Sequence, residues 1–163
     1  MKLGFIGCGN MAKAMLGGIL KNEICAKEDV IATAKSEASR ENARNTYGIQ
    51  VTADNIEAAK SADVLVLATP VYFYSIDAQL KTLVDRSLAR WREVRGKELY
   101  YIVTMAEAEL SAADTTLACL HGYADCVAGA VERGTIIGSG VYEPGKVLGT
   151  PAMEKAYRMG KTI

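Results

Sequence analysis

A short glycine-rich segment near the start of the chain has the spacing that holds a nucleotide phosphate. The letters GCGNMA, residues 7–12, follow a strand-like run and open a helical pattern. In this GxGxxA spacing Gly7 makes a tight turn, Gly9 lets the backbone approach a pyrophosphate, and Ala12 keeps helix and strand close together. Unpaired amides at the start of the helix would face the phosphate oxygens. The alternative is a glycine turn that only packs. The predicted phosphate contacts are Gly7, Gly9, Asn10, Met11 and Ala12.

The type of nucleotide is indicated about twenty residues later, where an NAD site would place Asp or Glu on the ribose hydroxyls. The chain has Lys35 and Ser36 there, with Arg40 one helical turn further on. Two cations and a hydroxyl would attract a 2′-phosphate, whereas a carboxylate would repel it. The sequence therefore favours NADP over NAD. The alternative is that Lys35 and Arg40 are ordinary exposed charges at the start of a helix.

Strand-like and helical patterns alternate along the whole chain, and this alternation predicts an α/β fold. Apolar strand-like runs occupy 2–7, 29–34, 49–53, 63–69, 98–104 and 134–141. Helical patterns occupy 10–20, 36–46, 55–62, 76–91, 111–127 and 151–163. Such alternation is typical of a three-layer, doubly wound parallel sheet with helices on both faces. We expect a single domain over 1–163 with strand order 3-2-1-4-5-6, in which the loops after the first and fourth strands share one crevice.

The pattern over 76–91 predicts an amphipathic helix. Its apolar residues recur at steps of three and four: Ile76, Leu80, Leu83, Val84, Leu88 and Trp91. This spacing predicts that one face of the helix is buried. Ser75 is the expected N-cap, with Asp77 in the first turn. Segment 138–150 is rich in glycine and is predicted to be a loop that could form a flap.

The composition argues against several classes of function. Half of the 163 residues are hydrophobic, and 19 basic side chains balance 19 acidic ones, so neither nucleic acid nor an anionic membrane is an expected partner. The four cysteines lack a CxxC spacing and His121 has no cysteine at a zinc spacing, so no metal site is expected. No serine stands in a Ser/His/Asp pattern, and no catalytic residue is assigned. Without a membrane-spanning run or a signal peptide, we expect a cytoplasmic protein with reduced thiols.

The first 68 residues resemble a known family. The stretches MKLGFIGCGNMAKAMLGGIL, ATAKSEAS and YGIQVTADNIEAAKSADVLVLA closely resemble the N-terminal Rossmann domain of pyrroline-5-carboxylate reductases. These are NAD(P)H enzymes that reduce a cyclic imine in the last step of proline synthesis. After residue 68 the sequence departs from that family, so neither its imine-binding domain nor its activity is expected. The cofactor contacts that the resemblance implies are Gly7, Gly9, Asn10, Met11, Ala12, Ser36 and Arg40.

The rest of the chain resembles a different family. ADVLVLATPVYFYSIDAQLKTLVDR and GSGVYEPGKVLGTPAMEKAYRMGKTI resemble NADPH-dependent FMN reductases and related flavodoxin-like proteins. In that family Pro70 would rigidify the turn after the strand, and an aromatic ring would cover the flavin. The loop that holds the FMN phosphate there is replaced in this chain by residues 7–12. The residues implied around a flavin ring are Thr69, Pro70, Val71, Tyr72 and Phe73, with Thr104, Met105 and Ala106 from the next loop.

Each half of the chain thus carries one part of a cofactor site. The strand VLVLA has the same sequence pattern in both families, so a join between the two segments within this strand would preserve its packing. We predict an engineered chimera of segments 1–68 and 69–163 whose partner is a small-molecule nucleotide, with NADP at residues 7–12 and little or no catalysis. An oxidoreductase that binds FMN and a scaffold that binds no cofactor are the alternatives. The oligomeric state is not indicated.

Overall fold

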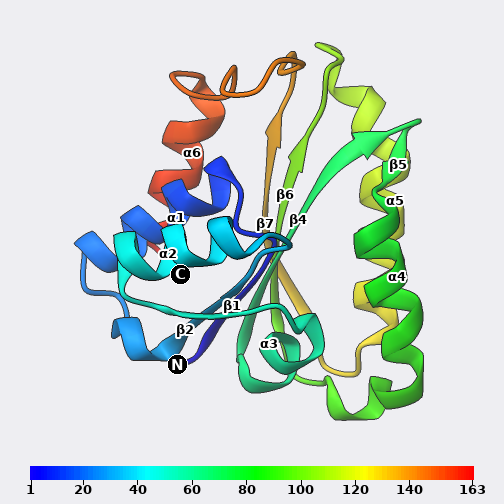
Figure 1. The fold of residues 1–163 in the computed structure, drawn as a ribbon. Helices are drawn as coiled ribbons and strands as arrows, with labels where there is room; N and C mark the ends of the chain where they lie inside the picture. The colour runs from blue at the N-terminus through cyan, green and yellow to red at the C-terminus, as the bar shows by residue number, and fades with distance from the viewer.

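A computed structural model describes the backbone of residues 1–163 and the side chains of all of them except Arg90. The elements alternate between strands and helices, as the sequence predicts (Figure 1). In chain order they are β1 (Leu3–Ile6), α1 (Asn10–Lys21), η1 (Lys27–Asp29), β2 (Val30–Thr33), α2 (Glu37–Tyr47), β3 (Gln50–Thr52), α3 (Asn55–Ser61), β4 (Val64–Tyr72), β5 (Ser75–Ile76), α4 (Ala78–Ser87), η2 (Leu88–Glu93), β6 (Glu98–Thr104), η3 (Leu110–Ala113), α5 (Asp114–Cys126), β7 (Val131–Gly138) and α6 (Pro151–Gly160).

The strands form a single sheet with the order β3-β2-β1-β4-β6-β7. Neighbours along this path pair in parallel, and the short β5 pairs antiparallel with β4 alone. The predicted order 3-2-1-4-5-6 is confirmed, because β6 and β7 are the fifth and sixth strands that the sequence indicates. Strand β4 lies at the centre, where Leu65 is opposite Gly4 of β1 and Leu99 of β6.

Helices cover both faces of the sheet and complete a three-layer arrangement. In Figure 1, α1, α2 and α6 lie on the left of the sheet, and α4 and α5 lie on the right. Successive residues of β4 point into different cores: Val64 and Val66 pack with α1 and α6, whereas Leu65 and Leu67 pack with α3, α4 and α5. This alternation follows from the two-residue period of a strand. The doubly wound α/β fold predicted from the sequence is therefore the fold of the chain.

Helices α1 and α6 cross in close contact through two glycines. A Cβ added to Gly18 would lie 2.3 Å from the carbonyl oxygen of Tyr157, and one added to Gly160 would lie 2.2 Å from that of Met15. Neither position has room for a side chain, because the obstacle is backbone of the other helix. The two glycines therefore set the distance between a helix from the start of the chain and a helix from its end.

The prediction of one amphipathic helix over 76–91 is wrong at its C-terminal end. Helix α4 stops at Ser87 and the chain continues as the 3-10 helix η2. A 3-10 helix has about 3.0 residues per turn instead of 3.6, so the apolar stripe turns away from the core. Leu88 is 73% exposed and Trp91 is 42% exposed, whereas Leu80, near the start of α4, is buried as predicted.

A tight hairpin follows the central strand where the sequence predicts only a turn. Strand β4 runs beyond Thr69 to Tyr72, which pairs with Ser75 of β5. The two residues of the turn, Phe73 and Tyr74, have φ angles of 49° and 63°. Positive φ at both central residues is the type I′ geometry that suits the twist of a hairpin. Residues other than glycine adopt it at a cost of about 1–2 kcal/mol each.

The hairpin changes the cap of the next helix. Ser75, the predicted N-cap, lies in β5, and its hydroxyl is 4.0 Å from the sulfur of Cys119. Asp77 caps α4 instead, because its Oδ1 accepts a 2.6 Å hydrogen bond from the amide of Leu80. The prediction for Ser75 is therefore wrong by two residues, since the hairpin delays the start of the helix.

Among the described residues, no helix combines the length and the apolar composition that a membrane span requires.

Candidate functional site

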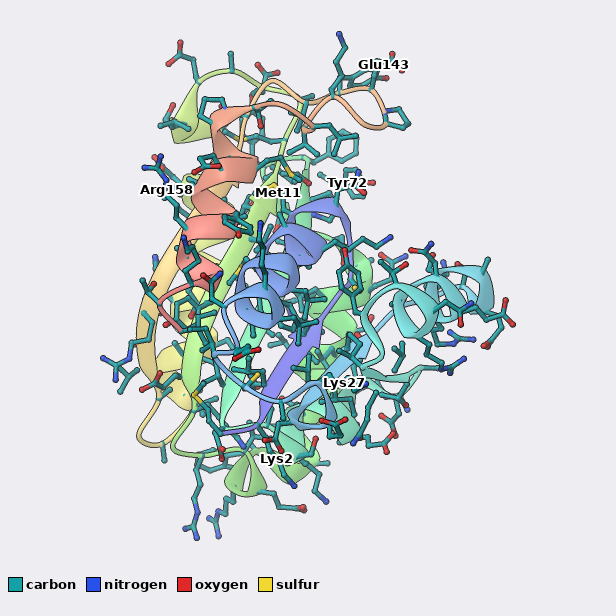
Figure 2. All side chains as sticks on the ribbon, turned by 90° about the vertical axis from the view of Figure 1, so that its left-hand side faces the viewer. Lys2, Met11, Lys27, Tyr72, Glu143 and Arg158 are labelled. Atoms are coloured by element: carbon teal, nitrogen blue, oxygen red, sulfur yellow. The ribbon has the colours of Figure 1, made fainter. Side chains whose placement is uncertain are left out.

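A crevice of about 470 Å³ opens at the carboxyl ends of the central strands. Lys2, just before β1, and Glu143, beyond β7, lie at opposite ends of the molecule, and the crevice is at the Glu143 end (Figure 2). Open α/β sheets bind ligands at this edge, where the strand order reverses. The lining residues are Gly7, Gly9, Asn10, Met11, Ala12, Ala68, Thr69, Pro70, Asp77, Ile102, Thr104, Val141, Tyr142, Glu143, Pro144, Gly145 and Val147.

The start of α1 forms one wall of this crevice and presents free amides. Gly7 has a φ of 97°, and a Cβ there would lie 3.3 Å from Ala68, so the turn requires glycine. Gly9 is the N-cap of α1, has no side-chain cap and leaves open space where a Cβ would be. No acidic residue lies in the first turn. The first amides of the helix and its positive dipole end are thus available to an anion.

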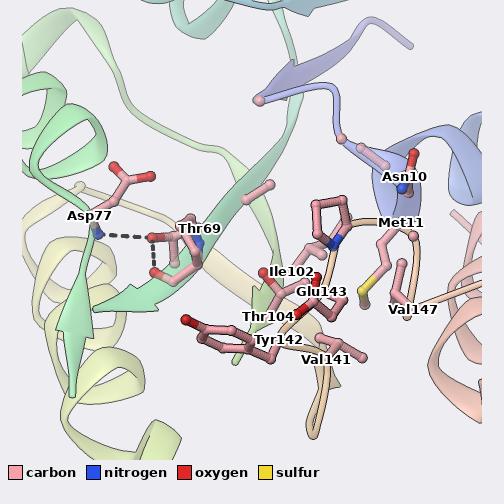
Figure 3. A pocket seen from close by; sticks show the side chains of 17 residues that line it. Asn10, Met11, Thr69, Asp77, Ile102, Thr104, Val141, Tyr142, Glu143 and Val147 are labelled. Atoms are coloured by element: carbon pink, nitrogen blue, oxygen red, sulfur yellow. Dashed lines mark hydrogen bonds between the residues drawn. The ribbon is translucent and has the colours of Figure 1, made fainter. Parts of the chain in front are cut away.

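The end of β4 forms the opposite wall. The Thr69 hydroxyl donates a 2.8 Å hydrogen bond to the Pro70 carbonyl and accepts a 3.0 Å hydrogen bond from the Asp77 amide. Figure 3 shows Thr69 and Asp77 on one side of the crevice and Asn10 and Met11 on the other. The loop after β1 and the residues Thr69 and Pro70 of β4 therefore share one crevice. The sequence predicted that the loop after the fourth strand would lie there, but β4 continues to Tyr72 and the turn that follows it is outside the described lining.

A second cavity of about 290 Å³ continues the crevice toward β2 and β3. The two cavities share Gly7, Ala68 and Asp77, so they meet at the glycine turn. Thr33, at the end of β2, accepts a 3.1 Å hydrogen bond from the Gly7 amide and fixes this junction. Lys35 lines the second cavity and supplies a positive charge there. The two cavities together form a groove that passes over the start of α1.

The start of α2 gathers the other residues predicted around a 2′-phosphate. Ser36 caps the helix by accepting a 3.2 Å hydrogen bond from the amide of Ser39. Arg40 donates to the carbonyls of Ala34 and Lys35 at 2.7 and 2.8 Å and forms a 2.6 Å ion pair with Glu37. Hydrogen bonds from Arg40 and then from Arg44 hold the pKa of Glu37 below its usual value. Arg40 thus neutralises Glu37 and fixes the loop that presents Lys35.

The sequence comparisons agree with this geometry in the N-terminal part. Residues 2–90, more than half of the chain, match the family described as NADP oxidoreductase coenzyme F420-dependent. The chain belongs to this family. A pyrroline-5-carboxylate reductase from Vibrio alginolyticus is 46% identical over 67 residues, 41% of this chain and 24% of that enzyme. Pyrroline-5-carboxylate reductase 2 from Bacillus subtilis is 35% identical over 68 residues, with the same coverage of 41% and 24%. The chain therefore spans about a quarter of the length of these relatives.

Solved structures resemble the whole chain in fold. The flavodoxin, WrbA-like protein from Agrobacterium tumefaciens has a TM-score of 0.67 at 16% identity and covers 100% of this chain and 95% of its own. An imine reductase from Myxococcus stipitatus, in complex with NADP+, has a TM-score of 0.54 at 18% identity over 83% of this chain and 41% of its own. At these identities the likeness shows the fold alone, and that fold is shared by Rossmann and flavodoxin-like proteins. The family match continues past residue 68, through β4 and α4.

In this family member the predicted flavin residues separate into two groups. Thr69 and Pro70 line the crevice, and so does Thr104 from the next strand. Val71 packs partly against the core, and Tyr72 and Phe73 belong to the hairpin, outside the described lining of the crevice. Phe73 is fully exposed, at 101% of its reference area. The extension of β4 causes this separation, because the strand carries these residues past the crevice.

Sequence reasoning missed one residue of the crevice wall and indicated another part only as a loop that could form a flap. Asp77 contributes a carboxylate to both cavities, although the sequence indicates only a helix-start residue. Segment 141–147 covers one side with Val141, Tyr142 and Glu143, as Figure 3 shows. The glycine-rich composition that predicts a flap there was the available signal. Its position over the crevice depends on the place of β7 in the sheet.

Cys8, within the glycine turn, is not an activated thiol. Burial raises the pKa of the Cys8 thiol, and the nearby charge of Lys13 opposes this effect only in part. Cys8 is therefore a neutral thiol at pH 7 and a packing residue, because the thiolate is the reactive form. In the part of the chain that the structure describes, no group of three or more His, Cys, Asp or Glu side chains could hold a metal ion.

Proposed function

We propose that the chain binds NADP(H) in the groove formed by the two cavities. The observation that carries this proposal is the uncapped start of α1, whose free amides face a crevice that continues to Lys35. In a Rossmann fold the pyrophosphate lies at this helix start, the adenosine half lies toward the second strand, and the nicotinamide half lies toward the fourth. The nicotinamide half would then lie near Thr69 and Tyr142.

The start of α2 favours NADP over NAD. Lys35, Ser36 and Arg40 are the groups that would surround a 2′-phosphate, as proposed from the sequence. Glu37 is the acidic residue closest in sequence to Lys35 and Ser36, and its ion pairs with Arg40 and Arg44 compensate its negative charge. A 2′-phosphate can take a hydrogen bond from Lys35, whereas a neutral ribose hydroxyl would leave the lysine without an anionic partner.

We propose little or no turnover by this chain alone. Hydride transfer needs an acceptor or donor held against the nicotinamide, and the protein supplies that position. The polar side chains along the nicotinamide side of the crevice are Thr69, Asp77, Thr104, Tyr142 and Glu143. Thr69 is engaged with Pro70 and Asp77. The chain thus acts as an NADP(H)-binding module.

A second candidate is a flavoprotein, and one observation favours it. Thr69, Pro70 and Thr104 line the same crevice as the amides at the start of α1, so an FMN could place its phosphate on the helix and its ring at the strand ends. A substituted phosphate loop would lack charge-assisted contacts worth about 1.5–3 kcal/mol each. NADP(H) is therefore the first candidate.

We further propose that the chain is an engineered chimera whose two segments join within β4. The strand pairs with β1 on one side and with β6 on the other, so a join there keeps both interfaces. The parent proteins would act in the cytoplasm, where free cysteines such as the four of this chain stay reduced. A genome that encodes both segments in one reading frame would overturn the engineered origin.

A thermal-shift series with NADP, NAD and FMN, alongside a visible spectrum, tests the proposed function. A ligand present at 100 times its Kd stabilises the folded state by about 2.7 kcal/mol. We expect NADP to raise the Tm more than NAD does, and the protein to be colourless as purified. An unchanged Tm in millimolar NADP would overturn the proposal. A yellow protein, or quenching of FMN fluorescence, would favour the second candidate.

A further inference from the structure

An exposed tyrosine lines the crevice on the side where the nicotinamide half of the proposed cofactor would lie. Tyr142 belongs to the described lining and is nevertheless 81% exposed. Figure 3 shows its ring extending from segment 141–147 toward the side of the crevice where Thr69 lies. Ala68 and Ile102 add apolar surface to the same lining. A large aromatic ring is thus available to a flat ligand ring that enters the crevice.

Both ends of this segment are anchored, so the place of Tyr142 is defined. The Val141 amide donates a 2.9 Å hydrogen bond to the Met105 carbonyl, just after β6. At the other end of the segment, Val147 is buried in the core cluster that also contains Met11 of α1. Tyr142 directly follows the first anchor, which keeps its ring beside the ends of the strands.

The charges in the crevice favour a positively charged ring. Among the described residues of the lining, the charged side chains are Asp77 and Glu143, and both are acidic. Lys146 of the same segment lies outside that lining. The oxidised nicotinamide ring carries a positive charge, which is lost when a hydride adds to it. A cation is attracted by a carboxylate and by the face of a tyrosine ring, whereas the neutral reduced ring gains neither contribution.

We propose that Tyr142 covers the nicotinamide ring and, together with Glu143, makes the crevice prefer the oxidised cofactor, NADP+, to NADPH. This inference rests on the proposed binding of NADP(H) and deepens it by naming the redox state that the site holds more tightly. Tighter binding of the oxidised form lowers the reduction potential of the bound cofactor. A tenfold preference corresponds to about 30 mV for this two-electron couple.

Calorimetric titrations of the full chain with NADP+, NADPH and adenosine 2′,5′-bisphosphate test the inference. The bisphosphate lacks the nicotinamide half, so it reports on the rest of the groove. We expect NADP+ to bind about tenfold tighter than NADPH, the range for a cation–π contact beside a carboxylate.

Variants of segment 141–147 assign this preference to its residues. Tyr142→Leu should reduce the preference to about twofold or less and leave the affinity for the bisphosphate unchanged. Tyr142→Phe retains an aromatic face and should retain the preference. Glu143 is exposed, so its charge is screened by solvent, and Glu143→Gln should reduce the preference by only about twofold.

Tyr72→Leu is the matched control. Tyr72 is also an exposed tyrosine, at 62%, and it lies at the end of β4 outside the described lining of the crevice. This variant should leave all three affinities unchanged. Equal affinity for NADP+ and NADPH, or a preference that Tyr142→Leu leaves intact, would overturn the inference while the proposed function stands. Failure of all three ligands to bind would overturn both.

Discussion

At the scale of single residues, Gly9 is a position where a substitution should weaken cofactor binding without destabilising the fold. A Cβ at this position would meet nothing within 4 Å, and its φ of −82° is open to any residue. The same open space is where a pyrophosphate would approach the amides of α1. Gly9→Ala should therefore leave the Tm within a few degrees of wild type and weaken NADP binding about tenfold or more, as measured by calorimetry.

Gly17→Ala is the control for that variant. Gly17 lies inside α1, and an added Cβ there also meets nothing within 4 Å. Since alanine is favoured over glycine in a helix by about 0.5–1 kcal/mol, this change should raise the Tm and leave NADP affinity unaltered. If Gly9→Ala bound NADP as wild type does, the start of α1 would not be the phosphate site.

Tyr101 gives the fold a pH dependence in the alkaline range. Its hydroxyl is buried and donates a 3.0 Å hydrogen bond to Glu132, which also contacts His121 at 2.8 Å. Burial, and then the bond to Glu132, raise the pKa of Tyr101 far above its usual value of about 10. The tyrosine therefore stabilises the folded state fully below pH 10, and this contribution is lost as the pH rises towards the raised pKa.

The Tyr101→Phe variant tests this dependence. At pH 7 the free energy of unfolding should fall by about 0.5–1.5 kcal/mol, because a buried hydrogen bond is lost. Above pH 10 the wild type should lose stability faster than the variant, so the difference should shrink with rising pH. Urea unfolding at pH 7, 9, 10 and 11 measures it. A difference that stays constant over this series would contradict the raised pKa.

At the scale of elements, the cap of α4 decides where that helix begins. The Oδ1 of Asp77 accepts the Leu80 amide, while Ser75 is held in the hairpin strand. Asp77→Ala should lower the free energy of unfolding by about 1 kcal/mol, within the range for lost N-caps. Asp77→Asn keeps a capping oxygen and should cost less. Chemical denaturation measures both.

Ser75→Ala is the matched comparison for the cap. The described contact of the Ser75 hydroxyl is Cys119 at 4.0 Å, so its loss should change stability by less than about 0.5 kcal/mol. A larger loss for Ser75→Ala than for Asp77→Ala would mean that the helix begins where the sequence predicted it.

At the scale of the whole molecule, the contact of α1 with α6 ties the two ends of the chain together. Gly160→Ala would place a Cβ 2.2 Å from the Met15 carbonyl oxygen, so the two helices would have to separate. We expect a loss of about 1–3 kcal/mol, the usual cost of overpacking, seen as a lower Tm. Gly18→Ala should behave in the same way, whereas Gly17→Ala on the same helix should not destabilise. Equal Tm values for all three variants would exclude a tight helix crossing.

The strand order and the glycine loop could be predicted because they depend on local patterns. A parallel sheet needs apolar runs separated by helices, and a glycine turn needs a backbone that only glycine adopts. The exposure of Leu88 and Trp91 could not be predicted, because it depends on a change of helical period that the apolar spacing does not reveal. The hairpin after β4 could not be predicted either, because its turn has Phe73 and Tyr74 at positive φ where the sequence pattern of such a turn would have glycine.

The sequence by itself determined the fold class, the strand order and the residues at the start of α1, because spacing along the chain fixes each of them. Tertiary structure alone decided which residues meet at the crevice. It brought Asp77 and segment 141–147 to the glycine loop and left Tyr72 and Phe73 on the hairpin. The physical reason is that a crevice between parallel strands collects residues distant in sequence, whose positions follow from sheet register and from where each strand ends.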